Sequence, residues 1–186
     1  GGCANDTTTA NVTITASATA GNLSGTQAIC VAATSQFSTD GTAGGTWTSD
    51  DTNVATVSSS GLVTGVGAGT ATITYTVGGL TATRTVTVTA TPDAGTLSGT
   101  QAICVNGTSQ ITQGGDNTPA PGSLAPSFTW TSSDTNVATV SSSGLVSGVA
   151  AGSATIYYIV TGTGGCANDT SSISITVTAA PNAGTI

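Results

Sequence analysis

The chain has 186 residues, enough for one or two domains of ordinary size. Charged residues make up only 5% of it, with eight acidic residues (all aspartate), one basic residue (Arg84), no histidine and a net charge of −7. This composition excludes the clustered lysine and arginine that nucleic acids and anionic membrane surfaces require, and no run of ~20 apolar residues predicts membrane insertion. Without histidine, glutamate or lysine, neither a Ser-His-Asp nor a Cys-His arrangement can form within the chain. We therefore expect no enzyme, no catalytic residues and no cofactor.

The first 19 residues repeat a later part of the chain. "GGCANDT" opens the sequence and returns at residues 164–170, and residues 1–19 align with residues 164–182 without a gap. Within this segment "TANVTITAS" alternates polar and apolar residues, with Val12 and Ile14 on one face, as β-strands do. We therefore expect residues 1–19 to be the last strand of a preceding repeat in a longer array, lying unpaired or against a neighbouring edge.

Two full repeats follow this segment. "AGNLSGTQAICV" begins at Ala20, "AGTLSGTQAICV" begins at Ala94, and "AGTI" returns at the end of the chain. Later landmarks recur in the same order, including "TNVATVSSSGLV" in both halves. The spacing predicts repeat 1 at residues 20–93, repeat 2 at residues 94–182 and the start of a next repeat at residues 183–186.

Short strands with a period of two fill each repeat. In "GTATITYTV" of repeat 1, Ala71, Ile73 and Tyr75 alternate with threonines, which places the apolar set toward a core and the threonines toward solvent. Clusters of glycine, asparagine, aspartate and serine separate such runs, and the third strand of each repeat carries one tryptophan, Trp47 or Trp130, expected in the core. The pattern predicts an all-β chain of tandem immunoglobulin-like antiparallel β-sandwiches, with about seven strands each.

Part of each repeat resembles a known domain family. The motifs W-(T/S)-S-x-(D/N)-x-x-V-A-T-V and G-L-V-x-G-V-x-A-G-x-A-x-I occur in both repeats, and they resemble the bacterial Ig-like group 2 domain. The added "QAIC" and "GGC" patterns resemble giant surface adhesins of Bacteroidota, of the SprB gliding-motility kind. This resemblance implies type IX secretion, an extracellular location at the cell surface, and a role in cell adhesion or gliding motility.

An array of such sandwiches favours a mechanical role. Each repeat carries its own small core, so repeats joined end to end form a long, thin object with almost no surface charge to attract a specific partner. We expect a stalk segment of a large secreted adhesin or filament, whose partners are the neighbouring repeats and, for the whole protein, surface glycans or abiotic surfaces. One alternative is a module that binds a glycan or another surface through the loops of repeat 2. Another is the accessory region of a secreted enzyme.

The four cysteines recur at two kinds of position. Cys30 and Cys104 end the first strands of the two repeats, whereas Cys3 and Cys166 lie in hairpins before a last strand. In immunoglobulin topology the first turn lies at the C-terminal end of a repeat and the last hairpin at the N-terminal end, a strand length of ~17–20 Å apart. Because a disulfide needs Cα atoms at about 4.4–6.8 Å, this topology favours a Cys30–Cys166 bond across the junction over a Cys104–Cys166 bond within repeat 2.

A sequence difference between the repeats supports the crossing bond. Repeat 1 has "GGL" where repeat 2 has "GGC", so Leu80 is expected at the cysteine position, and bonds within repeats would leave Cys30 alone. If disulfides instead join neighbouring repeats across their junctions, the partners of Cys3 and Cys104 lie outside this chain. A bond within repeat 2 and the absence of any bond remain the alternatives.

Repeat 2 also contains an insertion. "QGGDNTPAPGSLAP" at residues 113–126 lengthens the loop between its second and third strands, and its last hairpin is longer too. In immunoglobulin topology both loops lie at the end that faces repeat 1. Three interpretations stay open: a tolerated surface insertion, a junction pad that buries Leu124 and the prolines, and a binding loop.

Aspartates in turns raise a metal hypothesis. Asp50, Asp51 and Asp134 follow the tryptophan strands and Asp93 lies in the linker, where carboxylate oxygens would suit Ca²⁺. No D-x-D-x-D loop is present, however, and Ser133 replaces Asp50 in repeat 2. Hydrogen bonds from these carboxylates to their own turns are therefore the favoured interpretation, and we predict no metal ligand.

Overall fold

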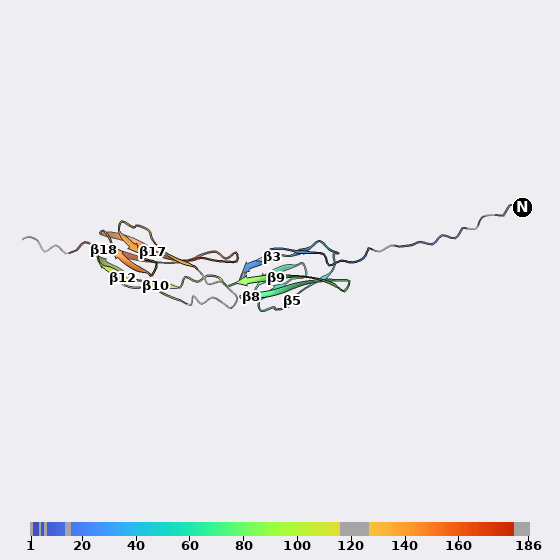
Figure 1. Cartoon of the computed structure of the whole chain (residues 1–186), viewed down its shortest axis with the longest axis horizontal. Coiled ribbons are helices and arrows are strands. Elements are labelled where there is room, and N and C mark those ends of the chain that lie inside the picture. The colour runs from blue at the N-terminus through green and yellow to red at the C-terminus, as the bar shows by residue number, and fades with distance from the viewer. Residues whose placement is uncertain (1, 4, 6, 14–15, 116–126, 181–186) are drawn as a thin grey trace, which may run out of the picture.

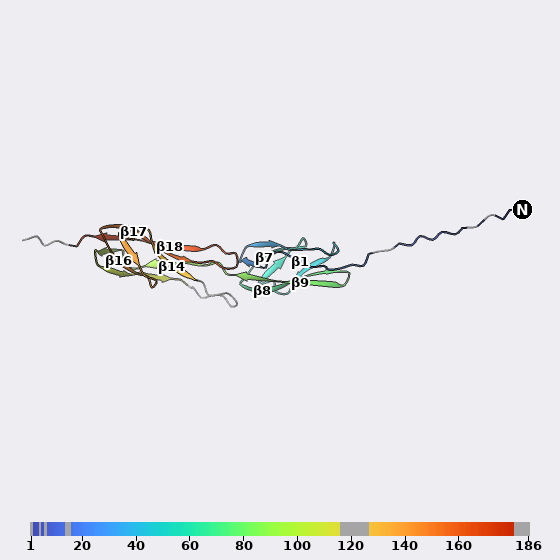
Figure 2. The same ribbon diagram turned by 45° about the horizontal axis from the view of Figure 1, so that its top comes forward.

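The computed structural model describes the chain except for residues 1, 4, 6, 14–15, 116–126 and 181–186. All regular elements of the described part are β-strands, and no helix there is long and apolar enough to cross a membrane. Figure 1 shows two groups of strands arranged end to end, one for each repeat, with an extended N-terminal segment leading away from repeat 1. Figure 2 shows the same arrangement from a second direction.

The two repeats use the same order of elements. Repeat 1 contains β1 (Leu23–Ser24), β2 (Ala28–Cys30), β3 (Thr34–Gln36), β4 (Ser38–Thr39), β5 (Thr46–Ser49), β6 (Ala55–Val57), β7 (Leu62–Gly65), β8 (Gly69–Val77) and β9 (Leu80–Thr89). Repeat 2 contains β10 (Thr96–Ser98), β11 (Ala102–Cys104), β12 (Thr108–Gln110), β13 (Thr112–Gly114), β14 (Phe128–Ser132), β15 (Ala138–Val140), β16 (Leu145–Gly148), β17 (Gly152–Val160) and β18 (Asp169–Thr178).

Each repeat is a sandwich of two sheets. In repeat 1 a four-stranded sheet has the order β2-β9-β8-β5, a three-stranded sheet has the order β3-β7-β6, and β1 pairs with β4. In repeat 2 the corresponding orders are β11-β18-β17-β14 and β12-β16-β15, with β10 paired to β13. The predicted tandem immunoglobulin-like fold is confirmed.

Two details differ from a plain antiparallel seven-strand sandwich. The first and second strands of each repeat are split, β1 from β2 and β3 from β4, so that seven expected strands become nine segments. In addition, β2 pairs with the end of β9 in parallel, and β11 does the same with β18. Because of this parallel pairing, the end of the first strand lies beside the end of the last strand.

The period-two pattern places the core as expected. On β8 the side chains of Ala71, Ile73 and Tyr75 are buried, and the threonines between them are more exposed. Trp47 packs against this core with its ring centroid 4.8 Å from that of Tyr75, and Trp130 repeats the arrangement with Tyr158 at 4.8 Å. Both tryptophans therefore pack against the core, as predicted, with their side chains half-buried.

The described residues of the N-terminal segment form no sheet. None of the described residues before Leu23 belongs to a strand, and the Val12 side chain is 84% exposed. Ile175, which aligns with Val12, is fully buried on β18. The assignment of residues 1–19 to a preceding repeat stays a prediction.

The last hairpins of the two repeats differ in length. In repeat 1, Val77 pairs with Leu80 across a two-residue turn whose glycines both have positive φ angles, 56° at Gly78 and 81° at Gly79. In repeat 2, Val160 pairs with Asp169, so a loop of residues 161–168 joins the same two strands. Leu80 is therefore the structural counterpart of Asp169, and the expected match of Leu80 to Cys166 is wrong. Cys166 lies in a longer loop that repeat 1 lacks.

Candidate functional site: the junction between the repeats

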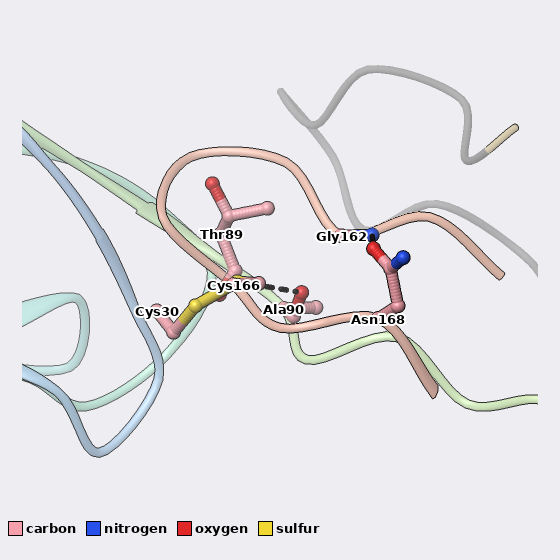
Figure 3. The surroundings of a disulfide bond; sticks show 6 residues. All are labelled: Cys30, Thr89, Ala90, Gly162, Cys166 and Asn168. Atoms are coloured by element: carbon pink, nitrogen blue, oxygen red, sulfur yellow. Dashed lines mark hydrogen bonds between the residues drawn. A yellow bond between two sulfur atoms is a disulfide. The ribbon is translucent and has the colours of Figure 1, made fainter. Parts of the chain in front are cut away.

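A disulfide bond joins the two repeats. Cys30 at the end of β2 is bonded to Cys166 in the loop between β17 and β18, with an S–S distance of 2.02 Å and a Cα–Cα distance of 5.3 Å. Figure 3 shows the loop of repeat 2 reaching over the end of repeat 1, where Cys166 meets Cys30 beside Thr89 and Ala90. This is the pair that the topology argument placed across the junction.

The position of Cys30 follows from the parallel pairing of β2. Cys30 pairs with Thr89, the last residue of β9, so it lies where the chain leaves repeat 1 for repeat 2. A turn follows at once, because Ala33 donates a backbone hydrogen bond to the Cys30 carbonyl oxygen at 3.0 Å. Ala32 in this turn has a φ angle of 66°, whereas its counterpart in repeat 2 is Asn106, also at 66°.

The loop that carries Cys166 is closed on itself. Gly162 N–H donates to the Asn168 side-chain oxygen at 3.0 Å, and Cys166 N–H donates to the Thr163 carbonyl oxygen at 3.1 Å. Gly164 and Gly165 have φ angles of 63° and 88°, which glycine adopts without steric cost. The "GGC" motif thus forms a turn that projects the cysteine toward repeat 1.

The loop packs directly against Thr89 of repeat 1. A Cβ atom added to Gly164 would lie 2.3 Å from Thr89 Oγ1, so the backbone of the loop rests directly on this side chain. The Cys166 sulfur lies 3.8 Å from the Thr89 carbonyl oxygen and 3.6 Å from that of Ala90. Because a disulfide sulfur carries no proton, these are close contacts, and only a reduced Cys166 would donate to the two oxygens.

A second set of contacts fixes the linker. Asp93 accepts a hydrogen bond from Gly95 N–H at 2.7 Å, and Asp169 at the start of β18 accepts one from Ala94 N–H at 2.8 Å. Ser171 on β18 donates to the Gly95 carbonyl oxygen. Ala94 is fully buried among Tyr158, Val160 and their neighbours. The linker is therefore held by the same strand that the disulfide loop leads into.

Cys104 occupies the position in repeat 2 that Cys30 occupies in repeat 1. It pairs with Thr178 as Cys30 pairs with Thr89, and the Thr178 hydroxyl lies 3.8 Å from its sulfur. Cys104 and Thr178 are exposed, however, whereas Cys30 and Thr89 are buried at 8% and 9% exposure. In the described part of the chain Cys104 and Cys3 are free.

The turn aspartates bind backbone groups. Asp51 accepts a hydrogen bond from Asn53 N–H and Asp134 accepts one from Asn136 N–H, both at 2.9 Å. The bond that Thr72 N–H donates to Asp50 at 2.7 Å holds the pKa of that carboxyl below its usual range. No group of three or more aspartate or cysteine side chains suited to a metal ion occurs among the described residues.

Two further sequence features are the insertion of repeat 2 and the basic residue Arg84. Most of the insertion at residues 113–126, including Leu124, lies outside the described residues, so its three interpretations stay open. Arg84, the one basic residue, is half-buried and donates to the carbonyl oxygens of Leu23 at 2.7 Å and Gly25 at 3.1 Å. It holds β1 against β9, and composition alone did not indicate this role.

Tandem immunoglobulin-like sandwiches joined by a structural junction define the class of this protein. The sequence profile of the bacterial Ig-like domain (group 2) matches residues 8–88 and 93–171, so the chain belongs to this family. The family assignment agrees with the motifs found in both repeats.

Further comparisons give more distant similarities. Ice-binding protein 1 of Shewanella frigidimarina (strain NCIMB 400) is 40% identical over 139 residues, which is 73% of this chain but only 15% of that protein. The structure of surface layer protein SbsC, domains 1-6, is 26% identical with a TM-score of 0.34, covering 80% of this chain and 23% of that one. SbsC domains 4 and 5 are 24% identical with a TM-score of 0.33, covering 80% and 82%.

Proposed function

We propose that the chain is a stalk segment of a large secreted cell-surface adhesin or filament that serves surface attachment or gliding motility. The observation that carries this proposal is the disulfide between Cys30 and Cys166, which binds one repeat to the next at a second point besides the linker. Two repeats connected only by a short linker would be free to bend at the junction. A second covalent connection, with the loop resting on Thr89, would hold the two repeats in one fixed orientation. We call such a rigid junction a splint.

The rest of the molecule supports a structural role. Both repeats have closed cores, and their outward faces are rich in threonine and serine with almost no charge. Disulfides persist in oxidising surroundings, so a structural disulfide favours an extracellular location at the cell surface. The partners of this segment are neighbouring repeats, and contact with glycans or abiotic surfaces belongs to other parts of the whole protein. Secretion by the type IX route rests on the resemblance to gliding adhesins alone.

The same junction would recur along an array wherever the following repeat carries the cysteine loop (residues 161–168 in repeat 2). Cys104 and Thr178 correspond to Cys30 and Thr89, the side of the junction that the cysteine loop contacts. The "GGC" at residues 1–3 corresponds to the cysteine loop itself. Their partners are a following and a preceding repeat, respectively. Because repeat 1 lacks the cysteine loop, an array would be bonded and stiffened only at those junctions where the following repeat carries this loop.

The test of this proposal is the rigidity of the junction in solution. In the oxidised protein, ¹⁵N relaxation should give both repeats one common, anisotropic tumbling. In a Cys30→Ser/Cys166→Ser variant the two repeats should tumble with shorter and separate correlation times. A Cys3→Ser/Cys104→Ser variant is the matched control, since it removes two cysteines and keeps the junction bond. Equal tumbling in all three proteins would contradict the splint.

A further inference from the structure

We infer that the junction disulfide gives the chain a covalent tension path that bypasses the cores of both repeats. The inference rests on the proposed stalk function, because only a stalk under load would use such a path. It concerns which bonds carry force when the two ends of the segment are pulled apart.

The path through repeat 1 is its first strand. The chain enters at Ala20 and Leu23, which pack beside Tyr75 near the β8–β9 hairpin, the end of repeat 1 away from the junction. It then runs through β1 and β2 to Cys30, beside the last residue of β9. A pull on the N-terminal side therefore reaches the junction along one strand.

The path through repeat 2 is its last strand. Cys166 lies three positions before β18, and β18 starts at Asp169 and ends at Thr178, where it pairs with Cys104 at the far end of the repeat. In Figure 2, β18 runs roughly along the horizontal direction in which the two repeats follow one another. A strand is already near its maximal length, at about 3.3 Å of a possible 3.6 Å per residue. Pulling it from both ends therefore adds little length and leaves its neighbours unloaded.

The disulfide connects these two strands directly. Cys30 and Cys166 are separated by 136 positions in sequence. In the oxidised chain the residues between them form a covalently closed loop, a side branch that is not part of the shortest covalent path between the two termini. That branch holds β3 to β17, including most of both cores and the linker. The strands on this branch, which make up the rest of each sandwich, then transmit none of the load.

The reduced chain would carry force differently. Load would enter repeat 1 on β2 and leave on β9, so it would shear the short parallel pair Ala28–Cys30 against Thr87–Thr89. In repeat 2 it would shear β11 against the end of β18, again over three register pairs. Once such a short clamp breaks, the rest of the repeat can unfold.

Single-molecule pulling tests this inference on the full chain, with handles joined enzymatically to its two ends. Non-reducing peptide mapping first identifies the Cys30–Cys166 link. The oxidised protein should extend without unfolding steps and retrace the same curve on relaxation, up to forces at which the reduced protein unfolds. The reduced protein should show two steps, whose released length includes roughly 450–490 Å for the 136 positions between the cysteines.

Two variants make the result specific. Cys30→Ser/Cys166→Ser should give the two steps without reductant, and Cys3→Ser/Cys104→Ser should behave as the oxidised parent. If the mapped, oxidised protein shows unfolding steps or hysteresis like the reduced one, the tension path is overturned and the splinted junction stands. If mapping finds no Cys30–Cys166 peptide, the tension path and the splint both fail.

Discussion

Gly164 of repeat 2 rests against Thr89 of repeat 1 so closely that a Cβ atom on Gly164 would lie 2.3 Å from Thr89 Oγ1. The two residues belong to different repeats, and their contact sits beside the disulfide, as Figure 3 shows for Thr89 and Cys166. The absence of a side chain at residue 164 is therefore a condition for the loop to dock.

Replacing this glycine should weaken the junction bond. In Gly164→Ala the methyl group must displace the loop or Thr89, which costs about 1–3 kcal/mol beyond the backbone strain at positive φ. We expect the effective concentration of the Cys30–Cys166 pair, measured by equilibration with glutathione, to fall about tenfold or more below that of the control. Gly165→Ala is the matched control, because its φ angle is also positive and its nearest atom, the Ala28 carbonyl oxygen, is 3.5 Å away. Equal losses in the two variants would show that docking on Thr89 contributes nothing.

The turn after Cys30 offers a stabilising substitution. Ala32 has a φ angle of 66°, a conformation that costs an alanine about 1 kcal/mol and that asparagine and glycine tolerate better. Ala32→Asn should therefore raise the free energy of unfolding of repeat 1 by about 0.5–1 kcal/mol, measured by urea denaturation. The exchange in the other repeat, Asn106→Ala, should lower the stability of repeat 2 by a similar amount. Changes of the same sign in both variants would rule out the backbone explanation.

The fold was predictable because its signals are local. The alternation of Ala71, Ile73 and Tyr75 with threonines identifies a strand with one buried face, and repetition of the same pattern identifies two sandwiches. The location of Cys30 at the junction also followed from topology, since the first turn of a sandwich lies at its C-terminal end.

The position of Leu80 and the contact of Thr89 were not predicted, because both depend on the geometry of the last hairpin. The alignment of "GGL" with "GGC" placed Leu80 at the cysteine position, but strand register puts Leu80 opposite Val77, where repeat 2 has Asp169. The contact of Thr89 with the loop was missed for the same reason, because a threonine at the end of a strand looks like any other outward residue. The two adjacent glycines before Cys166 were the available signal, since such a pair commonly marks a turn with positive φ.

The linker contact should influence the junction independently of the disulfide. Asp169 accepts the N–H of Ala94, a fully buried residue, so Asp169→Ala would leave that donor without its acceptor at a cost of about 1–3 kcal/mol. We expect a lower unfolding temperature for repeat 2 and increased amide hydrogen exchange at Ala94, in both oxidised and reduced protein. Asp93→Ala is a useful comparison, because Asp93 accepts from the neighbouring Gly95 within the same turn. A change that disappears on reduction would mean that Asp169 acts through the disulfide loop instead.

Acid should weaken repeat 1 through Asp50. The Thr72 N–H bond holds the pKa of this carboxyl below its usual range, and Asn22 does the same for Asp40. A carboxyl with a depressed pKa in the folded state contributes its stability fully above its unfolded value of about 3.9, and that contribution is lost as pH falls through the lower folded pKa. The unfolding temperature of repeat 1 should therefore decline below about pH 4.

The corresponding residue of repeat 2 suggests a substitution that tests the contribution of Asp50 to this pH dependence. Its counterpart of Asp50 is Ser133, whose hydroxyl accepts the N–H of Thr155 at 2.9 Å, so a serine can make the same hydrogen bond without a titrating group. Asp50→Ser should keep the unfolding temperature near that of the parent at pH 7 and reduce its decline below pH 4. Ser133→Asp should introduce such a decline into repeat 2. If calorimetry from pH 2 to pH 7 gives parallel curves for the parent and Asp50→Ser, the Thr72 bond does not couple proton binding to folding.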